Sequence, residues 1–184
     1  MENKLRPTLW RTCRVIASET RLRLIWCLFE KEDLCVADLA TEVGISDQNA
    51  SNQLRVINAR GLISPRRVQL KVFYYPQTNP EVEHAEALLN ALHLAYENKI
   101  SFKSVIRQAT AFTHARRIQI IRSLAKNRGS VEDLNEHLKI PEPSLRYHLL
   151  KLEARNFVKN INGVYRINRP GNSLGRVLMK IALR

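Results

Sequence analysis

The first third of the chain contains three successive stretches in which apolar residues recur at helical spacing. Residues 20–30 predict a helix whose inward positions are Leu22, Ile25, Leu28 and Phe29. A short helix follows over residues 36–43, and Gly44 is a good stop signal for it. Ser46 can cap a third helix, whose buried stripe consists of Ala50, Leu54 and Ile57. The short turn before the third helix, and Gly61 at its end, predict a helix-turn-helix.

The stretch after this helix-turn-helix has the pattern of a β-hairpin. Residues 62–76 read "LISPRRVQLKVFYYP", which gives a strand, a basic turn and a second strand rich in β-branched and aromatic residues. A hairpin in this place is a wing, so the first part of the chain is predicted to be a winged helix.

The same pattern occurs a second time along the chain. Residues 36–63 align with residues 131–158 at a constant offset of 95, with Val, Asp, Leu, Ile, Leu, Ala and Arg recurring in register. Residues 20–30 align with residues 116–126 if one residue is dropped in the intervening loop. In the second copy the inward positions are Leu145, Leu149 and Leu152, and Asn162-Gly163 is the turn of a second hairpin. The predicted fold is mainly α with small β-hairpin wings, in tandem winged helix-turn-helix domains joined by a long helix.

The first copy resembles a known family. Its segments "ETRLRLI", "LCVADLATEVGIS", "ASNQLRVINARGLI" and "RRVQLKVFYYP" are similar to those of the ArsR-type winged-helix transcriptional repressors. The resemblance implies a repressor that binds double-stranded DNA. Members of this family are usually single-domain homodimers, so the tandem arrangement departs from the family pattern.

Two further helices are predicted outside the winged helices. Asn79 can cap and Pro80 can open a connecting helix, whose apolar residues are spaced nearly as a heptad seam: Val82, Ala85, Leu89, Leu92, Tyr96 and Ile100. This helix is expected to pack against the second copy or another chain, or to be a core helix within one copy. Asn172 or Ser173 can cap a C-terminal helix, whose apolar face consists of Leu174, Val177, Leu178 and Ile181. An interface helix is favoured over one that lies on a membrane surface.

These elements give a prediction for the whole chain. The predicted parts are an N-terminal winged helix (residues 1–78), connecting helices (79–108), a C-terminal winged helix (109–168) and a final helix (169–184). A homodimer, if one forms, is expected to use the helix at 80–100 or the C-terminal helix.

Charge points to a polyanionic partner. Thirty Lys and Arg against 17 Asp and Glu give a net charge of +13. Residues 1–92 carry 12 basic and 11 acidic side chains, whereas residues 93–184 carry 18 and 6, so the excess lies in the second half. The longest apolar run is only six residues and no apolar signal region begins the chain, which predicts neither a membrane span nor secretion. Three cysteines without a pairing pattern favour the cytoplasm.

The outward face of each third helix and the basic wings supply the candidate DNA contacts, since amides can pair with adenine and arginine with guanine or phosphate. In the first copy the candidates are Gln48, Asn49, Ser51, Asn52, Gln53, Arg55, Arg66, Arg67 and Lys71. In the second copy they are Ser144, Arg146, Tyr147, His148, Lys151, Arg155, Lys159, Asn162 and Arg166.

No metal, cofactor or catalytic site is predicted. Metal-sensing relatives carry two cysteines separated by one residue on the second helix, whereas this chain has Cys35 followed by Val36 and Ala37. Burial of Cys35 is favoured over a thiolate site shared with Cys13 and Cys27. His93 and Glu97 are interpreted as a surface pair rather than as ligands. The chain has no phosphate-binding glycine loop, nucleophile elbow or HExxH sequence, so an enzyme is not predicted.

Two other functions stay open. Winged helices also serve as protein-docking modules, so the nearly neutral first copy could be a scaffold while only the basic second half binds DNA. RNA binding would share the charge signal, but Tyr147 is the one stacking aromatic residue on the predicted surface.

Overall fold

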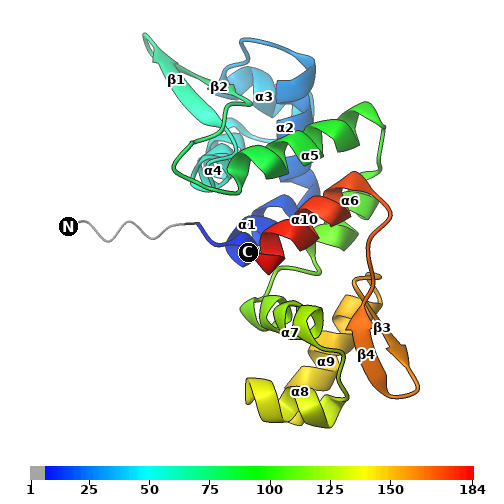
Figure 1. Ribbon diagram of the computed structural model, residues 1–184. Helices are drawn as coiled ribbons and strands as arrows, with labels where there is room; N and C mark the ends of the chain where they lie inside the picture. Colours follow the sequence, from blue (N-terminus) through cyan, green and yellow to red (C-terminus); the bar gives the residue numbers. More distant parts are fainter. Residues whose placement is uncertain (1–6) are drawn as a thin grey trace, which may run out of the picture.

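The computed structural model describes residues 7–184, and within them it contains the elements of two winged helices. The first half consists of α1 (Leu9–Ile16), α2 (Glu19–Glu30), α3 (Val36–Val43), α4 (Asp47–Asn58), β1 (Ser64–Val68), β2 (Lys71–Tyr75) and α5 (Ala85–Glu97). The second half consists of α6 (Phe102–Ala109), α7 (Ala115–Lys126), α8 (Val131–Leu138), α9 (Glu142–Glu153), β3 (Val158–Ile161), β4 (Val164–Ile167) and α10 (Ser173–Leu183). Figure 1 shows the two wings near opposite ends of an elongated molecule, with α1, α6 and α10 at its middle.

Local sequence signals explain the helix-turn-helix of the first copy, as predicted. Gly44 ends α3 in the left-handed region, with φ of 74°. The Ser46 hydroxyl accepts a hydrogen bond from the backbone N–H of Asn49 at 3.3 Å, which starts α4. The inward stripe of α4 is fully buried, and it consists of Ala50, Leu54 and Ile57.

Each wing is an antiparallel hairpin that is tied back to its own helix-turn-helix. β1 pairs with β2 and β3 pairs with β4. A single bridge joins Cys35 to Phe73 in the first copy, and a similar bridge, one position earlier in the repeat, joins Gly129 to Tyr165 in the second. The predicted Asn162-Gly163 turn is present, with both residues at positive φ (51° and 83°). The predicted fold class, tandem winged helices of mainly α structure, is therefore confirmed.

The duplication extends upstream of the segments that the sequence comparison aligned. Buried residues of α1 and its end correspond, 96 positions later, to buried residues of α6 and its end: Leu9 to Val105, Thr12 to Gln108, Cys13 to Ala109, Val15 to Ala111 and Ile16 to Phe112. Arg21 donates to the carbonyl oxygens of Val15 and Arg14. Arg117 makes the same two bonds, 96 positions later, to Ala111 and Thr110. Each copy is therefore a winged helix with an additional helix on either side.

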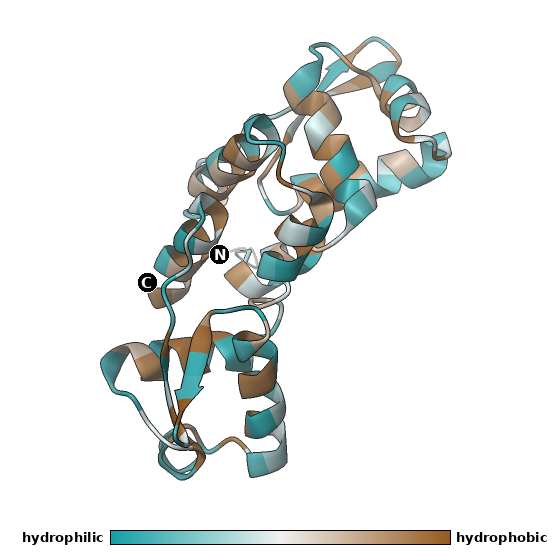
Figure 2. Cartoon of the chain, turned by 90° about the vertical axis from the view of Figure 1, so that its right-hand side faces the viewer, coloured by the Kyte–Doolittle hydropathy of each residue, from teal (hydrophilic) through white to brown (hydrophobic). Residues whose placement is uncertain are grey.

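The two copies meet through equivalent helices. α5 packs against α10, and α1 packs against α6. The buried residues that α5 contributes are Ala85, Leu88, Leu89, Ala91, Leu92 and Ala95. Figure 2, turned by 90° from Figure 1, shows these central helices bearing hydrophobic as well as hydrophilic positions between the two lobes. Of the partners considered for the connecting helix, the structure shows two: the second copy, through α10, and the core of its own copy, through α2.

The connection between the copies is shorter than the single long helix that was expected. The Asn79 carboxamide accepts from the N–H of Glu81 at 2.9 Å within a turn, and α5 begins only at Ala85. Lys99, at φ of 51°, breaks the chain direction after α5, so Ile100 lies outside the helix and is exposed. The reason is geometric, because α6 must leave α5 at an angle to pack against α1.

The C-terminal helix has the predicted cap but a wider buried face. The Asn172 side chain accepts from the N–H of Gly175 at 2.7 Å. Leu174 and Leu178 are buried as expected, whereas Val177 and Ile181 are half-buried. Met179 and Ala182 are buried as well, because α10 contacts α5, α6 and α7 together. No helix within residues 7–184 is long and apolar enough to cross a bilayer.

Candidate nucleic-acid interface

In the first copy the outward face of α4 presents a row of side-chain amides. Gln48, Asn49, Asn52 and Arg55 are exposed, and Ser51 is half-buried. Gln48 donates to Asn52 across one helical turn at 3.4 Å. These amides retain free donors and acceptors, which is the chemistry that reads adenine in a major groove.

Gln53 lies at the edge of this face and has a structural partner. Its side-chain oxygen accepts from Arg21 at 2.8 Å, and its amide nitrogen donates to Asn49 at 3.1 Å. Arg21 in turn holds the end of α1, so Gln53 connects α4 to the preceding helices. A contact from Gln53 to a base would require this bond to break.

The first wing places its predicted cations on the surface. Arg66, Arg67 and Lys71 are all exposed. Arg66 and Arg67 lie on β1, opposite Phe73 and Val72 on β2. Neither arginine forms an ion pair with another described residue, so both guanidinium groups are available for phosphates.

In the second copy the outward face of α9 carries cations and an aromatic ring. Arg146 and Tyr147 are exposed, while Leu145, Leu149 and Leu152 are fully buried beneath them. The ammonium group of Lys151 lies 5.2 Å from the centre of the Tyr147 ring. Arg146 pairs with Glu142 at 2.7 Å and lies 3.8 Å from Glu132, and its bond to Glu142 raises the pKa of its guanidinium. A phosphate would have to compete with these carboxylates for Arg146.

Three predicted residues of this copy have packing roles. His148 is buried, with 4% of its surface exposed, because it follows Leu145 by three residues and precedes Leu152 by four. Arg155 is half-buried and donates to the Thr110 hydroxyl and the Lys151 carbonyl, and burial lowers the pKa of its guanidinium. Ser144 accepts from Arg116 at 2.9 Å. The interpretation of His148 as an outward-facing residue is therefore wrong in this structure.

The second wing presents its basic residues side by side. Lys159, Asn162 and Arg166 are exposed, and Lys159 lies directly opposite Arg166 in the hairpin. Like charges across a hairpin repel each other unless an anion lies near them. This pair is therefore well placed for phosphate contact.

Two residues beside α9, Arg116 and His114, are not among the contacts predicted from the sequence. Arg116 bonds to Ser144, and the His114 ring lies 4.5 Å from that of His148. His114 caps α7 by accepting from the N–H of Arg116 at 3.1 Å. The sequence feature that could have identified them is the basic pair Arg116-Arg117 at the start of a predicted helix. Because that helix packs near the recognition helix, its first turn lies near the recognition helix too.

Two of the three cysteines, Cys13 and Cys35, are buried in the fold. Cys35 is buried at the start of α3, where its N–H donates to the Asp38 carboxylate at 2.9 Å. Ser130, its equivalent in the second copy, makes the same bond to Asp133 at 2.8 Å. Burial strongly raises the pKa of the Cys13 thiol. Among the residues that the structure describes, no three His, Cys, Asp or Glu side chains lie together as a metal site would need.

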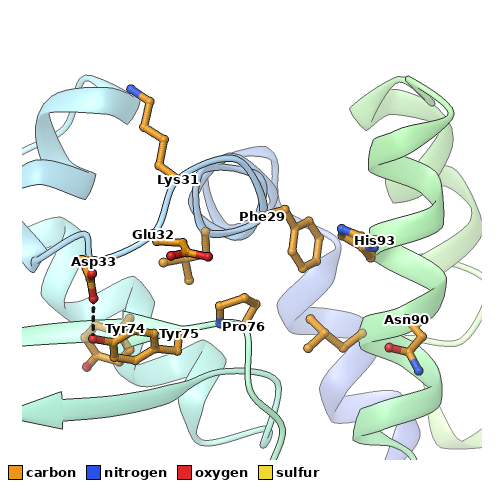
Figure 3. A pocket seen from close by; sticks show the side chains of 11 residues that line it. Phe29, Lys31, Glu32, Asp33, Tyr74, Tyr75, Pro76, Asn90 and His93 are labelled. Carbon is orange, nitrogen blue, oxygen red and sulfur yellow. Dashed lines mark hydrogen bonds between the residues drawn. The ribbon is translucent and has the colours of Figure 1, made fainter.

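A cavity of about 580 Å³ lies apart from this interface, between the end of α2, β2 and α5. Figure 3 shows Phe29, Tyr75, Pro76 and His93 around it, with the Tyr75 hydroxyl bonded to Asp33 at 2.9 Å. No residue of α4 or β1 lines this cavity.

Comparison with known proteins agrees with the repeated unit. A family model described as "Bacterial regulatory protein, arsR family" matches residues 18–64 and again residues 114–160. The chain is similar to the "Transcriptional repressor SmtB homolog" of Synechocystis sp. (strain ATCC 27184 / PCC 6803 / Kazusa), with 39% identity over 59 residues. This similarity covers 32% of the present chain and 44% of that relative, less than half of its length. No solved structure matches the chain. Because the family model matches both copies, and the two matches make up half of the sequence, the chain belongs to the arsR family of bacterial regulatory proteins, which are regulators and not enzymes.

Proposed function

We propose that this protein is a transcriptional repressor that binds double-stranded DNA with two recognition helices, α4 and α9, carried on one chain. The observation that carries the proposal is the packing of α5 against α10 and of α1 against α6. An interface in which equivalent elements meet is what a two-fold homodimer forms between separate chains. Here a single chain provides both partners, so a monomer would present two helix-turn-helix units to one duplex.

The candidate contacts divide between the two copies. Amides of α4 supply base-reading chemistry, and the cations of the two wings supply phosphate contacts. The compartment that we propose is the cytoplasm, where bacterial DNA lies. We also propose four parts of the chain: an N-terminal winged helix (residues 1–78), connecting helices (79–108), a C-terminal winged helix (109–168) and a final helix (169–184).

Charge favours a second candidate function. Residues 1–92 have 12 basic and 11 acidic side chains, against 18 and 6 in residues 93–184. A protein in which only the second copy binds DNA, with the first copy serving as a docking module, would have this asymmetry.

Homodimerisation of the whole chain through α5 or α10 would have to use their outer faces, since their inner faces cover each other.

The experiment is selection of a duplex from a random library, followed by fluorescence anisotropy and measurement of the mass of the complex. The proposal expects one chain per duplex and a protected region that spans two half-sites about one helical turn apart. Two chains on one such duplex would contradict it.

Variants assign the contacts. Replacing Gln48 and Asn52 together by Ala should relax sequence preference, and replacing Arg66 and Arg67 together by Ala should reduce the salt slope by about two. Lys180→Ala on α10 removes an exposed charge outside both recognition helices and both wings, and should leave affinity unchanged. If all first-copy variants bind as the parent does, the docking-module function replaces the two-helix one.

A further inference from the structure

A polar cavity lies where the two halves of the chain meet beside α9. Its volume is about 540 Å³, and it lies between the end of α1, the start of α7 and the first half of α9. Arg14 comes from α1, Arg116 and Arg117 come from α7, and Ser144 and Tyr147 come from α9. Arg14 also donates to the Thr113 carbonyl at 3.1 Å, so the first half contacts the second at this point.

The lining of this cavity is cationic and contains no carboxylate. Arg14, Arg116 and Arg117 line it, together with His114 and His148, and no Asp or Glu does. None of the three arginines forms an ion pair with any residue in 7–184. Three guanidinium groups without a counter-charge around one cavity attract an anion.

The arginine side chains are held in place before any ligand binds. Arg14 lies over the Trp10 ring at 4.9 Å, and Arg116 donates to Ser144 at 2.9 Å. Arg117 is buried and donates to the carbonyl oxygens of Ala111 and Thr110. Fixed donors lose little conformational entropy on binding, which favours a small ligand. The positive end of the α7 dipole adds to the same potential.

His148 supplies a further polar group with an unused bonding position. It is 4% exposed, it lines the cavity, and its Nδ1 has no hydrogen-bond partner among the described residues. Burial, and then the nearby His114, Arg117 and Arg116, lower the pKa of His148 to about 4. At neutral pH this imidazole is uncharged and has one N–H to donate.

The equivalent place in the first copy lacks this chemistry, which makes it an internal comparison. Thr20 and Ser18 stand where Arg116 and His114 stand in the second copy, and Glu19 replaces Ala115. Gln53 replaces His148, and it bonds to Arg21 at 2.8 Å, so its polar group is used. The cationic cavity is thus a feature of one copy and not of the winged helix in general.

We propose that this cavity binds a phosphate-type oxyanion, held by Arg14 and Arg116 with donors from Ser144 and His148. Two sources share that chemistry, free inorganic phosphate and a backbone phosphate of bound DNA. Either occupant would join α1 of the first half to α9 of the second. With free phosphate the cavity is a ligand site next to the recognition helix, whereas with DNA it adds an anchor to the proposed interface and rests on the proposed function.

The test begins without DNA, so its result does not depend on the proposed function. The full chain is titrated with sodium phosphate at constant ionic strength, and the ring-proton NMR signals of His114 and His148 are followed together with the melting temperature. A saturable shift of both signals and a rise in melting temperature are expected for free phosphate. Arg116→Thr, which introduces the first-copy residue, should weaken phosphate binding by about tenfold or more.

Two further variants complete the design. Arg14→Gln changes an exposed side chain and should have the same effect, and Lys180→Ala is the charge-matched control that should have none. If phosphate does not bind, but Arg14→Gln and Arg116→Thr each lower duplex affinity and the salt slope while Lys180→Ala does not, the occupant is a DNA phosphate. If neither phosphate binding nor duplex affinity responds to the two arginines, the proposal is overturned.

Discussion

At the scale of single residues, equivalent positions of the two copies show which side chains the fold requires. Arg21 and Arg117 make the same two bonds to backbone carbonyl oxygens at the end of the preceding helix. These bonds hold the same backbone groups in both copies, so the two guanidinium groups are structural. Gln53 and His148 differ in chemistry at one position, and only Gln53 bonds to the arginine of its copy.

Gly61 is predicted to be irreplaceable at the end of the α4 segment. Its φ is +70°, and a Cβ built there would lie 2.8 Å from a methyl carbon of Val82. Gly61→Ala should lower the free energy of unfolding by about 2 kcal/mol or more, through strain and overlap together. Gly163→Ala is the control, because Gly163 has φ of +83° with open space around it, and should cost about 1 kcal/mol. Equal losses in urea unfolding would show that the Val82 contact does not matter.

His148 is predicted to make stability depend on pH. The folded state lowers its pKa from 6.5 to about 4, so the unfolded chain binds the proton more readily between these values. Stability should therefore fall as pH decreases from 6.5 towards 4. His148→Gln, which introduces the first-copy residue, should flatten this dependence by about 1 kcal/mol or more. His84 and His114, whose pKa values burial also lowers, should leave a residual slope. An unchanged slope in denaturant melts at several pH values would argue against the buried neutral His148.

At the scale of elements, one apolar face can be satisfied by several partners. The residues of α5 predict a helix that needs a partner, and α10 has the same need. Their packing against each other satisfies both needs. α10 also contacts α7, so its position depends on both halves of the chain.

The N-cap of α10, Asn172, is predicted to contribute to the stability of the whole chain. Asn172→Ala removes the hydrogen bond to Gly175 and should lower the free energy of unfolding by about 1 kcal/mol. Asn172→Asp keeps the acceptor and should retain most of that stability. Ser173→Ala changes the next residue without removing the cap. A loss shared equally by Asn172→Ala and Ser173→Ala, measured by thermal unfolding, would contradict a specific capping role.

At the scale of the whole molecule, the fold is repeated in the two copies but the distribution of charge is not. The two copies have the same fold, yet nearly all of the net positive charge lies in residues 93–184. Two similar arrangements of helices therefore produce an electrostatic field that differs between the two halves of the molecule. This asymmetry would bias how the protein meets a polyanion, since the second copy would be attracted first.

Salt is predicted to control duplex affinity strongly. If the wings and recognition helices neutralise about six phosphates, affinity should fall on the order of a thousandfold between about 50 and about 200 mM salt. Charge reversal at Lys159 and Arg166 together should lower both affinity and salt slope, because these side chains lie opposite each other on an exposed hairpin. Anisotropy across a salt series measures both quantities. A flat salt dependence in the parent protein would contradict a phosphate-dominated interface.

The local structure and its repetition follow from the amino-acid sequence alone. Helix faces, the Gly44 stop, the Ser46 cap and the Asn162-Gly163 turn depend on residues close together in the chain, so periodicity and turn chemistry predict them. The inward position of His148 was readable in the same way, from its helical spacing to Leu145 and Leu152. By contrast, what covers α5, and the reach of Arg14 in the first half to Thr113 in the second, depend on the tertiary structure. These outcomes depend on which apolar faces meet in space, and many partners satisfy the same periodicity equally well.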